Sequence, residues 1–284
     1  MAVQHDEGLC IRQWDWSETS QTAMVFSRSL GMLRVLAKGA KRPKAAYSGG
    51  LEMLSRGRIG VIIRPATELA LLTEWDVVET YSGLRRRLQT HQAGMYIADV
   101  LQHVVRDQDP HPGLYDASID ALRALAAAGA SDDGDLLEAV ARALVVFQWR
   151  VLDESGVRPV LDRDARSAQP LSVREWYVFD PELGGLIAPV GAGAGDEDEG
   201  GGGGGEAGVG GPTRTERGWR VRHATVDLLQ RVARGEGLSS GAGAEPVGLA
   251  VLDRANRLLA SYLRFVLGTE PATMRTAFPK GLSR

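Results

Sequence analysis

Residues 16–44 read WSETSQTAMVFSRSLGMLRVLAKGAKRPK. Two runs in this stretch, 22–28 and 31–37, are rich in β-branched and large apolar residues. The turn sequence SLG separates them, which is typical of paired strands. In the second run the side chain of Arg34 points away from those of its apolar neighbours, because successive side chains alternate across a strand. The stretch therefore predicts two short strands joined by a glycine turn and followed by a basic loop.

One further strand is predicted before this pair and two after it. The runs 58–64 and 69–78 have the same character, and Cys10 lies in a predicted strand near the N-terminus, where a buried, unreactive thiol is the usual case. Five short strands within residues 1–80 favour a small barrel over a sandwich. The basic loop then falls at the end of a strand, on the rim of that barrel.

The charge of the chain is strongly segregated. The whole sequence has 33 Lys and Arg against 36 Asp and Glu, a net charge of −3. Between Arg28 and Arg64, however, nine basic residues accompany a single acid, Glu52. Local potential rather than net charge concentrates an anion at a surface, so this segment favours a polyanionic partner, with a solvated loop as the alternative.

The basic segment supplies the candidate site residues. We expect contacts to nucleic-acid phosphates, which position a strand without reading its sequence, from seven cations: Arg34, Lys38, Lys41, Arg42, Lys44, Arg56 and Arg58. Tyr47, beside the loop, is a candidate for stacking on a base. Trp14 and Trp16 are expected in the core, with base stacking as the alternative.

From residue 84 onward the apolar residues recur every three or four positions, which predicts amphipathic helices. The predicted helices cover 84–105, 114–128, 136–152, 225–234 and 247–267. Between the third and the fourth lies a glycine-rich, acidic segment, 191–216, which has too few apolar residues to fold and is predicted to be a flexible loop. We expect four parts in the chain: 1–80, 81–160, 161–216 and 217–284.

No constellation typical of an active site is found in the sequence. The five histidines lack metal-ligand spacing, and no Walker-type phosphate-binding loop occurs. Cys10 is the only cysteine, which excludes an internal disulfide and fits a reducing compartment. No apolar stretch is long enough to span a membrane. We therefore expect a non-enzymatic cytoplasmic protein without a small-molecule substrate.

Three blocks of sequence resemble those of the bacterial recombination mediator RecO family. The stretch 16–44, with its ETS turn and its AKGAKRPK loop, looks like the N-terminal block of the family. Residues 81–101, YSGLRRRLQTHQAGMYIADVL, are similar to the family's first long helix, and residues 257–278, RLLASYLRFVLGTEPATMRTAF, to its closing helix and tail. The resemblance implies an α+β protein, with an N-terminal OB-fold barrel followed by an α-helical C-terminal domain.

One part of the chain departs from the family pattern. Many members carry a zinc finger made from two CxxC pairs, but the matching positions here are Asp164, Ser167, Ala188 and Gly191. None is a thiolate, and one aspartate cannot complete a tetrahedral zinc site. We therefore expect a degenerate, metal-free zinc-finger-like insert in which 176–187 forms a hairpin, and no stoichiometric zinc or other cofactor.

The resemblance also implies a function and partners. RecO-like proteins bind single- and double-stranded DNA near the nucleoid, anneal complementary strands and contact the tail of single-stranded DNA-binding protein. With RecR they help to load RecA. The residues leave two alternatives open. One is an RNA-binding OB-fold, since backbone contacts dominate for both nucleic acids, and the other is a scaffold whose basic rim meets an acidic protein.

Overall fold

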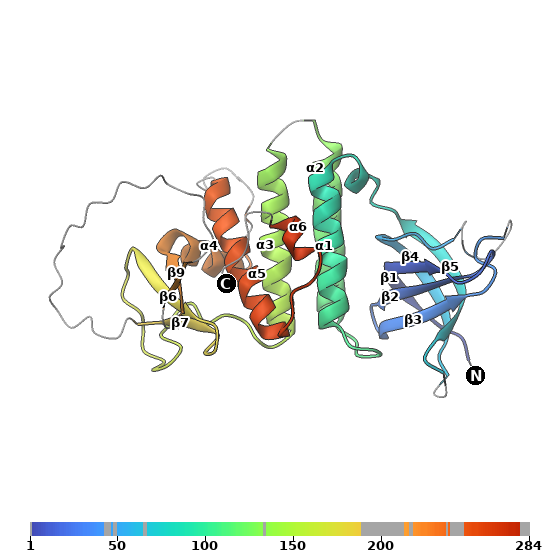
Figure 1. The fold of residues 1–284 in the computed structure, drawn as a ribbon, viewed down its shortest axis with the longest axis horizontal. Helices are drawn as coiled ribbons and strands as arrows, with labels where there is room; N and C mark the ends of the chain where they lie inside the picture. The colour runs from blue at the N-terminus through green and yellow to red at the C-terminus, as the bar shows by residue number, and fades with distance from the viewer. Residues whose placement is uncertain are drawn as a thin grey trace.

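The computed structural model describes residues 2–42, 47, 50–64, 67–132, 135–188, 213–215, 218–236, 238 and 247–278. The molecule is elongated, with a β-barrel at one end, helices in the middle and a small sheet at the other end (Figure 1). This arrangement follows the order of the sequence, except that the last helices return to pack against the first ones.

The barrel contains five strands in the closed order β1-β2-β3-β5-β4. They are β1 (Gln4–Asp15), β2 (Gln21–Ser27), β3 (Gly31–Ala37), β4 (Ser55–Ile62) and β5 (Ala70–Glu79). The neighbouring strands pair antiparallel, except for the parallel pair of β3 and β5. This topology confirms the predicted OB-type barrel. Strand β1 is the longest because it pairs with β4 along its first half and with β2 along its second.

The helical part confirms the predicted helices. It contains η1 (Ser82–Arg85), α1 (Leu88–Val104), α2 (Pro112–Ala130), α3 (Leu136–Glu154), α4 (His223–Ala233), α5 (Leu249–Leu267) and α6 (Met274–Ala277). Helix α1 begins later than predicted, because Tyr81 has a left-handed backbone conformation and 82–85 form a separate 3-10 turn. Helix α3 begins where the Asp135 carboxylate accepts hydrogen bonds from the backbone N–H groups of Leu137 and Glu138.

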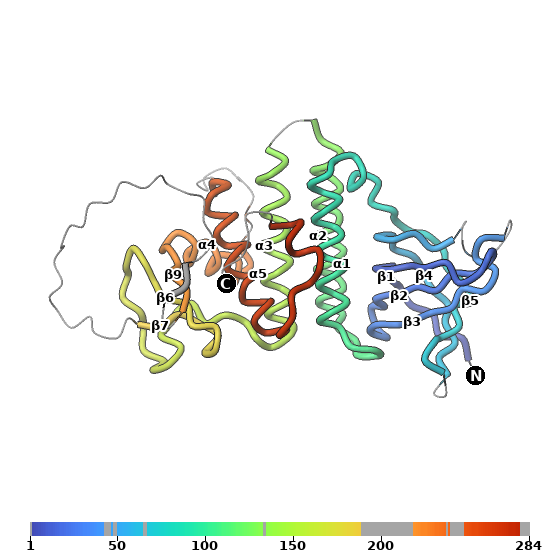
Figure 2. Tube along the Cα trace, in the orientation of Figure 1, coloured from blue at the N-terminus to red at the C-terminus, as the bar shows by residue number. Residues whose placement is uncertain are grey.

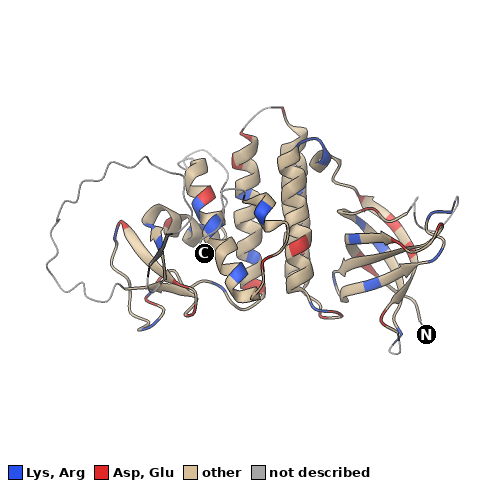
Figure 3. Ribbon diagram, in the orientation of Figure 1, with Lys and Arg blue, Asp and Glu red and all other residues tan. Residues whose placement is uncertain are grey.

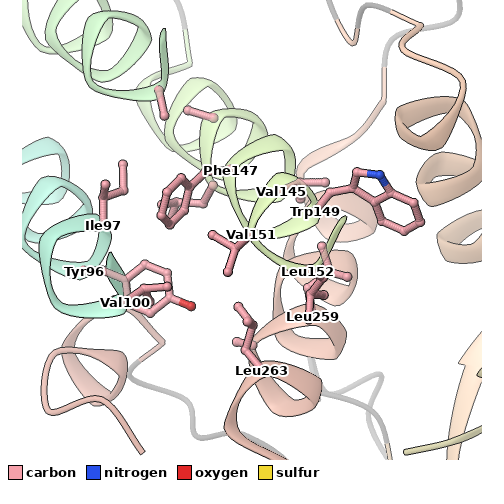
Figure 4. Packing of buried hydrophobic residues seen from close by; sticks show 14 of the residues in the cluster. Tyr96, Ile97, Val100, Val145, Phe147, Trp149, Val151, Leu152, Leu259 and Leu263 are labelled. Carbon is pink, nitrogen blue, oxygen red and sulfur yellow. The ribbon is translucent and has the colours of Figure 1, made fainter. Parts of the chain in front are cut away.

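The core of the helical part lies between α1, α3 and α5. Figure 4 shows Tyr96 and Val100 of α1 beside Phe147 of α3 and Leu263 of α5. The end of the described chain crosses back to α1 (Figure 2), where Phe278 packs edge-on against Tyr96 with ring centroids 5.4 Å apart. The C-terminal segment thereby completes a core that begins with the first helix.

Strand β2 is buried on both of its faces. Its inward residue Val25 belongs to the barrel core together with Trp75. Its outward residues Met24 and Phe26 belong to the core of the helical part, where Phe26 meets Tyr115 of α2 edge-on at a centroid distance of 5.5 Å. The barrel and the helices therefore share one apolar interface.

Ion pairs reinforce this interface. Arg28, in the turn between β2 and β3, donates hydrogen bonds of 2.9 and 2.8 Å to the Asp116 carboxylate of α2. These bonds from Arg28 lower the pKa of Asp116. Arg123 of α2 binds Glu79 of β5 at 3.0 Å. One cation of the basic segment, Arg28, thus serves the junction rather than a ligand.

The insert forms a four-stranded sheet of order β7-β6-β9-β8. Its strands are β6 (Trp176–Asp180), β7 (Gly185–Ile187), β8 (Thr213–Thr215) and β9 (Gly218–Arg222). Strands β6 and β7 confirm the predicted hairpin 176–187. Strand β8 lies inside the predicted flexible loop 191–216, so the predicted end of that loop is wrong, and most of the loop lies outside the described residues.

Asp164 joins the two arms of the insert. Its carboxylate accepts hydrogen bonds from the backbone N–H groups of Arg166 and Ser167 at 2.8 and 2.7 Å, and from the Ser167 hydroxyl at 3.1 Å. It also accepts one from the backbone N–H of Ala188, on the other arm of the insert. These bonds, above all the one from Ala188, lower the pKa of Asp164 to about 2. A carboxylate therefore bridges two of the positions at which the family resemblance places cysteines.

The donor set of the insert does not fit a zinc ion. Within the described ranges no three His, Cys, Asp or Glu side chains come together as metal ligands. The carboxylate of Asp164 already accepts four hydrogen bonds from the protein. The absence of stoichiometric zinc remains a prediction for elemental analysis.

Candidate nucleic-acid interface

Two loops meet at the end of the barrel that points away from the helices (Figure 1). The backbone N–H of Gly39 donates to the Ser20 hydroxyl at 3.1 Å, and that of Lys41 to the Thr19 carbonyl at 3.0 Å. The opposite ends of β2 and β3 lie against the helical part, as the Arg28 contact shows. We call residues 14–20 and 38–42 the barrel tip.

Three of the predicted cations lie on the barrel tip. Lys38 and Arg42 are exposed, and in the described part of the chain no carboxylate lies within 4.0 Å of either side chain. Lys41 pairs with Asp15 at 2.6 Å, and such surface pairs contribute at most about 1 kcal/mol. A phosphate can therefore replace Asp15 at little cost. Lys44 lies outside the described residues.

Trp14 and Trp16 are exposed on the same tip. Trp14 is 47% exposed and Trp16 63%, so the prediction that they pack in the core is wrong. The guanidinium carbon of Arg12 lies 5.9 Å from the ring centroid of Trp14. Flat apolar rings left in water beside cations are typical of surfaces on which nucleic-acid bases stack.

A β-bulge explains why Trp14 faces outward. The register between β1 and β2 shifts between Cys10 and Arg12. Cys10 lies opposite Val25 and belongs to the barrel core, whereas Trp14 lies opposite Thr22 on the outer face. Uninterrupted alternation from Cys10 would turn Trp14 inward, and the extra residue of the bulge reverses this.

Arg34 lies on the same outer face as Trp14. The strand registers place Arg12 and Arg34 in one row across β1, β2 and β3, and Trp14 in the next row toward the tip. The Nε of Arg34 is 3.5 Å from Asp107, and about half of its side chain is exposed. Cations and aromatic rings thus follow one line along the barrel toward its tip.

Tyr47 is a core residue rather than a stacking platform. It is 6% exposed, and its hydroxyl donates to the Leu72 carbonyl at 2.7 Å. Burial raises the pKa of this phenol. The predicted contact between Tyr47 and a base is wrong, because the ring belongs to the barrel core.

Arg56 and Arg58, on β4, face carboxylates from neighbouring strands. Only 17% of the Arg56 side chain is exposed, and its guanidinium lies 3.5 Å from Glu7 and 3.7 Å from Glu79. The Nε of Arg58 donates to Asp76 at 3.1 Å, in a hollow lined by further carboxylates. Figure 3 shows acids interleaved with cations over the barrel. Strand pairing therefore neutralises these two arginines, and we leave both out of the interface.

Neither the Cys10 thiol nor the described helices suggest a second kind of site. Burial raises the pKa of Cys10 to about 12, which confirms the expectation of an unreactive thiol. Among the described residues no helix is long and apolar enough to cross a bilayer. The exposed aromatic rings and cations of the barrel remain the best-defined candidate site.

Two family models match almost the whole chain. The model described as recombination protein O N terminal matches residues 1–81, and the one described as recombination protein O C terminal matches residues 85–275. The chain belongs to the recombination protein O family. The resemblance carried by residues 16–44, 81–101 and 257–278 is thereby confirmed, and the barrel corresponds to the N-terminal part of RecO.

Several relatives carry the name DNA repair protein RecO. The one from Rhodopirellula baltica is 35% identical over 155 residues, which are 55% of this chain and 54% of the relative. The one from Salinibacter ruber is 27% identical over 162 residues, 57% of this chain and 59% of the relative. These matches span between half and three fifths of either relative. The RecO protein from Anaeromyxobacter is 26% identical over 94% of this chain and 93% of its own length.

Proposed function

We propose that this RecO chain acts in DNA repair and recombination by holding single-stranded DNA on its barrel tip. The observation that carries the proposal is the pair of exposed tryptophans, Trp14 and Trp16, beside Lys38 and Arg42. Aromatic rings stack bases of any identity and cations follow the backbone, so such a surface binds without sequence preference. Annealing of arbitrary complementary strands requires this property.

We propose the partners of this chain from the family resemblance alone. On that basis the chain also binds double-stranded DNA and works with RecR to load RecA on strands coated by single-stranded DNA-binding protein. No catalytic role is proposed for any residue.

The cations of the tip are tested by the salt dependence of binding. In the variant Lys38→Ala/Lys41→Ala/Arg42→Ala, the slope of log affinity against log salt should flatten by about 2, since each phosphate contact to a single strand contributes about 0.7. Exposed loop changes usually cost less than about 0.5 kcal/mol of stability each, so the variant should fold. Titration of labelled oligothymidine at several salt concentrations measures the slope.

Arg58→Ala is the matched control, because it removes a barrel cation that Asp76 already neutralises. Its slope should equal that of the unaltered chain. A folded triple variant with unchanged affinity and slope would contradict the proposal and favour an acidic protein partner for the tip. Competition between labelled DNA and unlabelled RNA of the same length distinguishes the RNA-binding alternative.

The helical part offers an apolar cavity for a peptide end. The cavity has a volume of about 580 Å³ and lies between α1, α3, α5 and α6. Leu137, Val140 and Leu144 of α3 and Phe278 line it. A tail whose hydrophobic end must leave water fits such a cavity, while its carboxylates stay at the rim. We propose that the tail of single-stranded DNA-binding protein binds here.

Val140→Asp should weaken the affinity for the tail peptide by at least about tenfold. The substitution places an unpaired carboxylate in the apolar lining, where it also repels an acidic peptide. Fluorescence anisotropy of the labelled peptide measures the effect. Val146→Asp is the control, because Val146 is exposed on the same helix and does not line the cavity. Equal peptide binding by both variants would place the tail elsewhere.

A further inference from the structure

A second surface that combines aromatic and cationic groups lies at the other end of the molecule. On the sheet of the insert, the guanidinium carbons of Arg220 and Arg222 lie 4.5 and 4.6 Å from the ring centroid of Trp176. The register pairs Trp176 with Arg222 and Val178 with Arg220, so all four side chains share one face of the sheet. We call these residues the outer sheet face.

The opposite face of the same strands is occupied by the core. Phe179 stacks on Trp219 at a centroid distance of 5.7 Å and meets Tyr262 of α5 edge-on at 5.1 Å. Because side chains alternate across a strand, the burial of Phe179 and Trp219 directs Trp176, Arg220 and Arg222 away from the helices. The outer sheet face is therefore held in place by packing behind it.

Within the described ranges, the cations of the outer sheet face have no acidic partners. Arg220 and Arg222 are exposed, and no carboxylate of the described residues lies within 4.0 Å of either guanidinium. The acid nearest along β6, Asp180, accepts hydrogen bonds from the backbone N–H groups of Glu182 and Leu183 instead. The contrast with the barrel, where Arg56 and Arg58 are neutralised, is clear.

A third cation increases the local charge. Arg254 of α5 has a buried Nε without a hydrogen-bond partner among the described groups. Burial lowers the pKa of Arg254, and the nearby charge of Arg222 lowers it further. Arg222 and Arg254 therefore repel each other, with Asp253 offsetting part of the charge of Arg254, and an anion bound at Arg222 would relieve that repulsion.

The geometry suits a nucleic-acid backbone. Arg220 and Arg222 are two residues apart on one strand, so their Cα atoms are roughly 6.6 Å apart. This separation is similar to the spacing of successive phosphates along an extended single strand. Contact with Trp176 restrains both guanidiniums, which reduces the side-chain entropy lost when they bind phosphate.

We propose that the outer sheet face binds the phosphate backbone of a second DNA strand while the barrel tip holds the first. This inference rests on the proposed function of the tip. The two surfaces lie at opposite ends of the elongated molecule (Figures 1 and 3). One protein would then bridge two strands and raise the local concentration of the second strand around the first.

A bridging experiment with the full chain tests the inference. One oligothymidine is fixed to beads and a second, fluorescent oligothymidine is free, so that base pairing cannot join them. The unaltered chain should capture the fluorescent strand. Arg220→Ala/Arg222→Ala should reduce capture at least tenfold while the protein still binds the beads. Its salt slope for the second strand should flatten by about 1.4.

Two further variants control for charge and fold. Arg231→Ala/Arg234→Ala removes the same charge from the C-terminal end of α4 and its cap, where Glu236 pairs with both arginines, and should bridge normally. Arg220→Lys/Arg222→Lys keeps the charges and should retain most of the capture, whereas a misfolded sheet would not. Circular dichroism checks the fold of each variant.

The outcomes separate this inference from the proposal for the tip. If Arg220→Ala/Arg222→Ala bridges strands as well as the unaltered chain, the outer sheet face is not a DNA site, and an acidic protein becomes its better partner. If Lys38→Ala/Lys41→Ala/Arg42→Ala leaves the binding of both strands unchanged, the tip proposal fails instead. Residual binding by this triple variant should disappear when Arg220→Ala/Arg222→Ala is added.

Discussion

Trp14→Ala/Trp16→Ala should weaken the binding of single-stranded DNA by about 30-fold to about 10⁴-fold. Stacking on an aromatic side chain contributes roughly 1–3 kcal/mol per base, and about 1.4 kcal/mol corresponds to a factor of ten in affinity. The salt slope should stay unchanged, since no phosphate contact is removed. Anisotropy of labelled oligothymidine at fixed salt measures the affinity, and the same titration at several salt concentrations measures the slope.

Phe265→Ala is the matched control for this effect. Phe265 is an aromatic residue of α5 that is 47% exposed, as Trp14 is, but it lies in the helical part. Its removal should leave DNA binding unchanged. A folded tryptophan double variant that binds DNA like the unaltered chain would show that the exposed rings serve another partner.

Asp164→Ala should destabilise the insert by at least about 3 kcal/mol. The carboxylate accepts four hydrogen bonds, and each bond to a charged group contributes roughly 1.5–3 kcal/mol, although such contributions are not fully additive. The backbone N–H of Ala188 loses its partner in this variant. Urea unfolding followed by tryptophan fluorescence and hydrogen exchange at the Ala188 amide both report the change.

Asp180→Ala provides a comparison within the same sheet. Among the described groups, the Asp180 carboxylate accepts hydrogen bonds from its own turn alone, from the backbone N–H groups of Glu182 and Leu183. Its loss should cost about 1 kcal/mol, which is typical of a local cap. If the Asp164 and Asp180 variants are equally stable, the bond from Asp164 to Ala188 does not hold the two arms together.

The contribution of Asp164 should also depend on pH. Its pKa is lowered from 3.8 to about 2, so the folded state favours the charged carboxylate. The stabilisation is therefore complete above about pH 5 and is lost as the pH falls from about 4 toward 2. The stability difference between the unaltered chain and Asp164→Asn should shrink over this interval. A difference that stays constant down to pH 2 would contradict the assignment.

Helical periodicity predicts the helices, short apolar and β-branched runs between turns predict the barrel, and the turn-like sequence PELGG at 181–185 predicts the hairpin of the insert. The errors concern contacts that join distant parts of the chain. Arg56 is neutralised by Glu7 and Glu79, which lie in other strands, so a count of charges along one segment overestimated the number of cations available for a ligand. The orientation of Trp14 depends on a single bulge residue that alternation from Cys10 does not reveal.

The bridging aspartate could have been suspected but not established from sequence. The family resemblance places Asp164 at a cysteine position, and an aspartate with a following Ser167 is typical of a local turn. The bond to Ala188, however, depends on how the two arms fold back on each other. The sequence does not reveal strands β8 and β9, because they have three and five residues and follow a glycine-rich segment. Such short strands contain too few residues to establish an alternation of apolar and polar residues.

The burial of β2 on both faces fixes the distance between the barrel and the helical part. Met24 and Phe26 attach the barrel to α2 by side-chain packing, with no independent linker between the two parts. If the two proposals hold, a strand on the barrel tip and a peptide in the helical cavity lie at a separation that is set by the fold. An excised fragment of residues 1–80 should lose this fixed spacing, because it lacks the helical part. Its outward side chains Met24 and Phe26 should then be exposed to water.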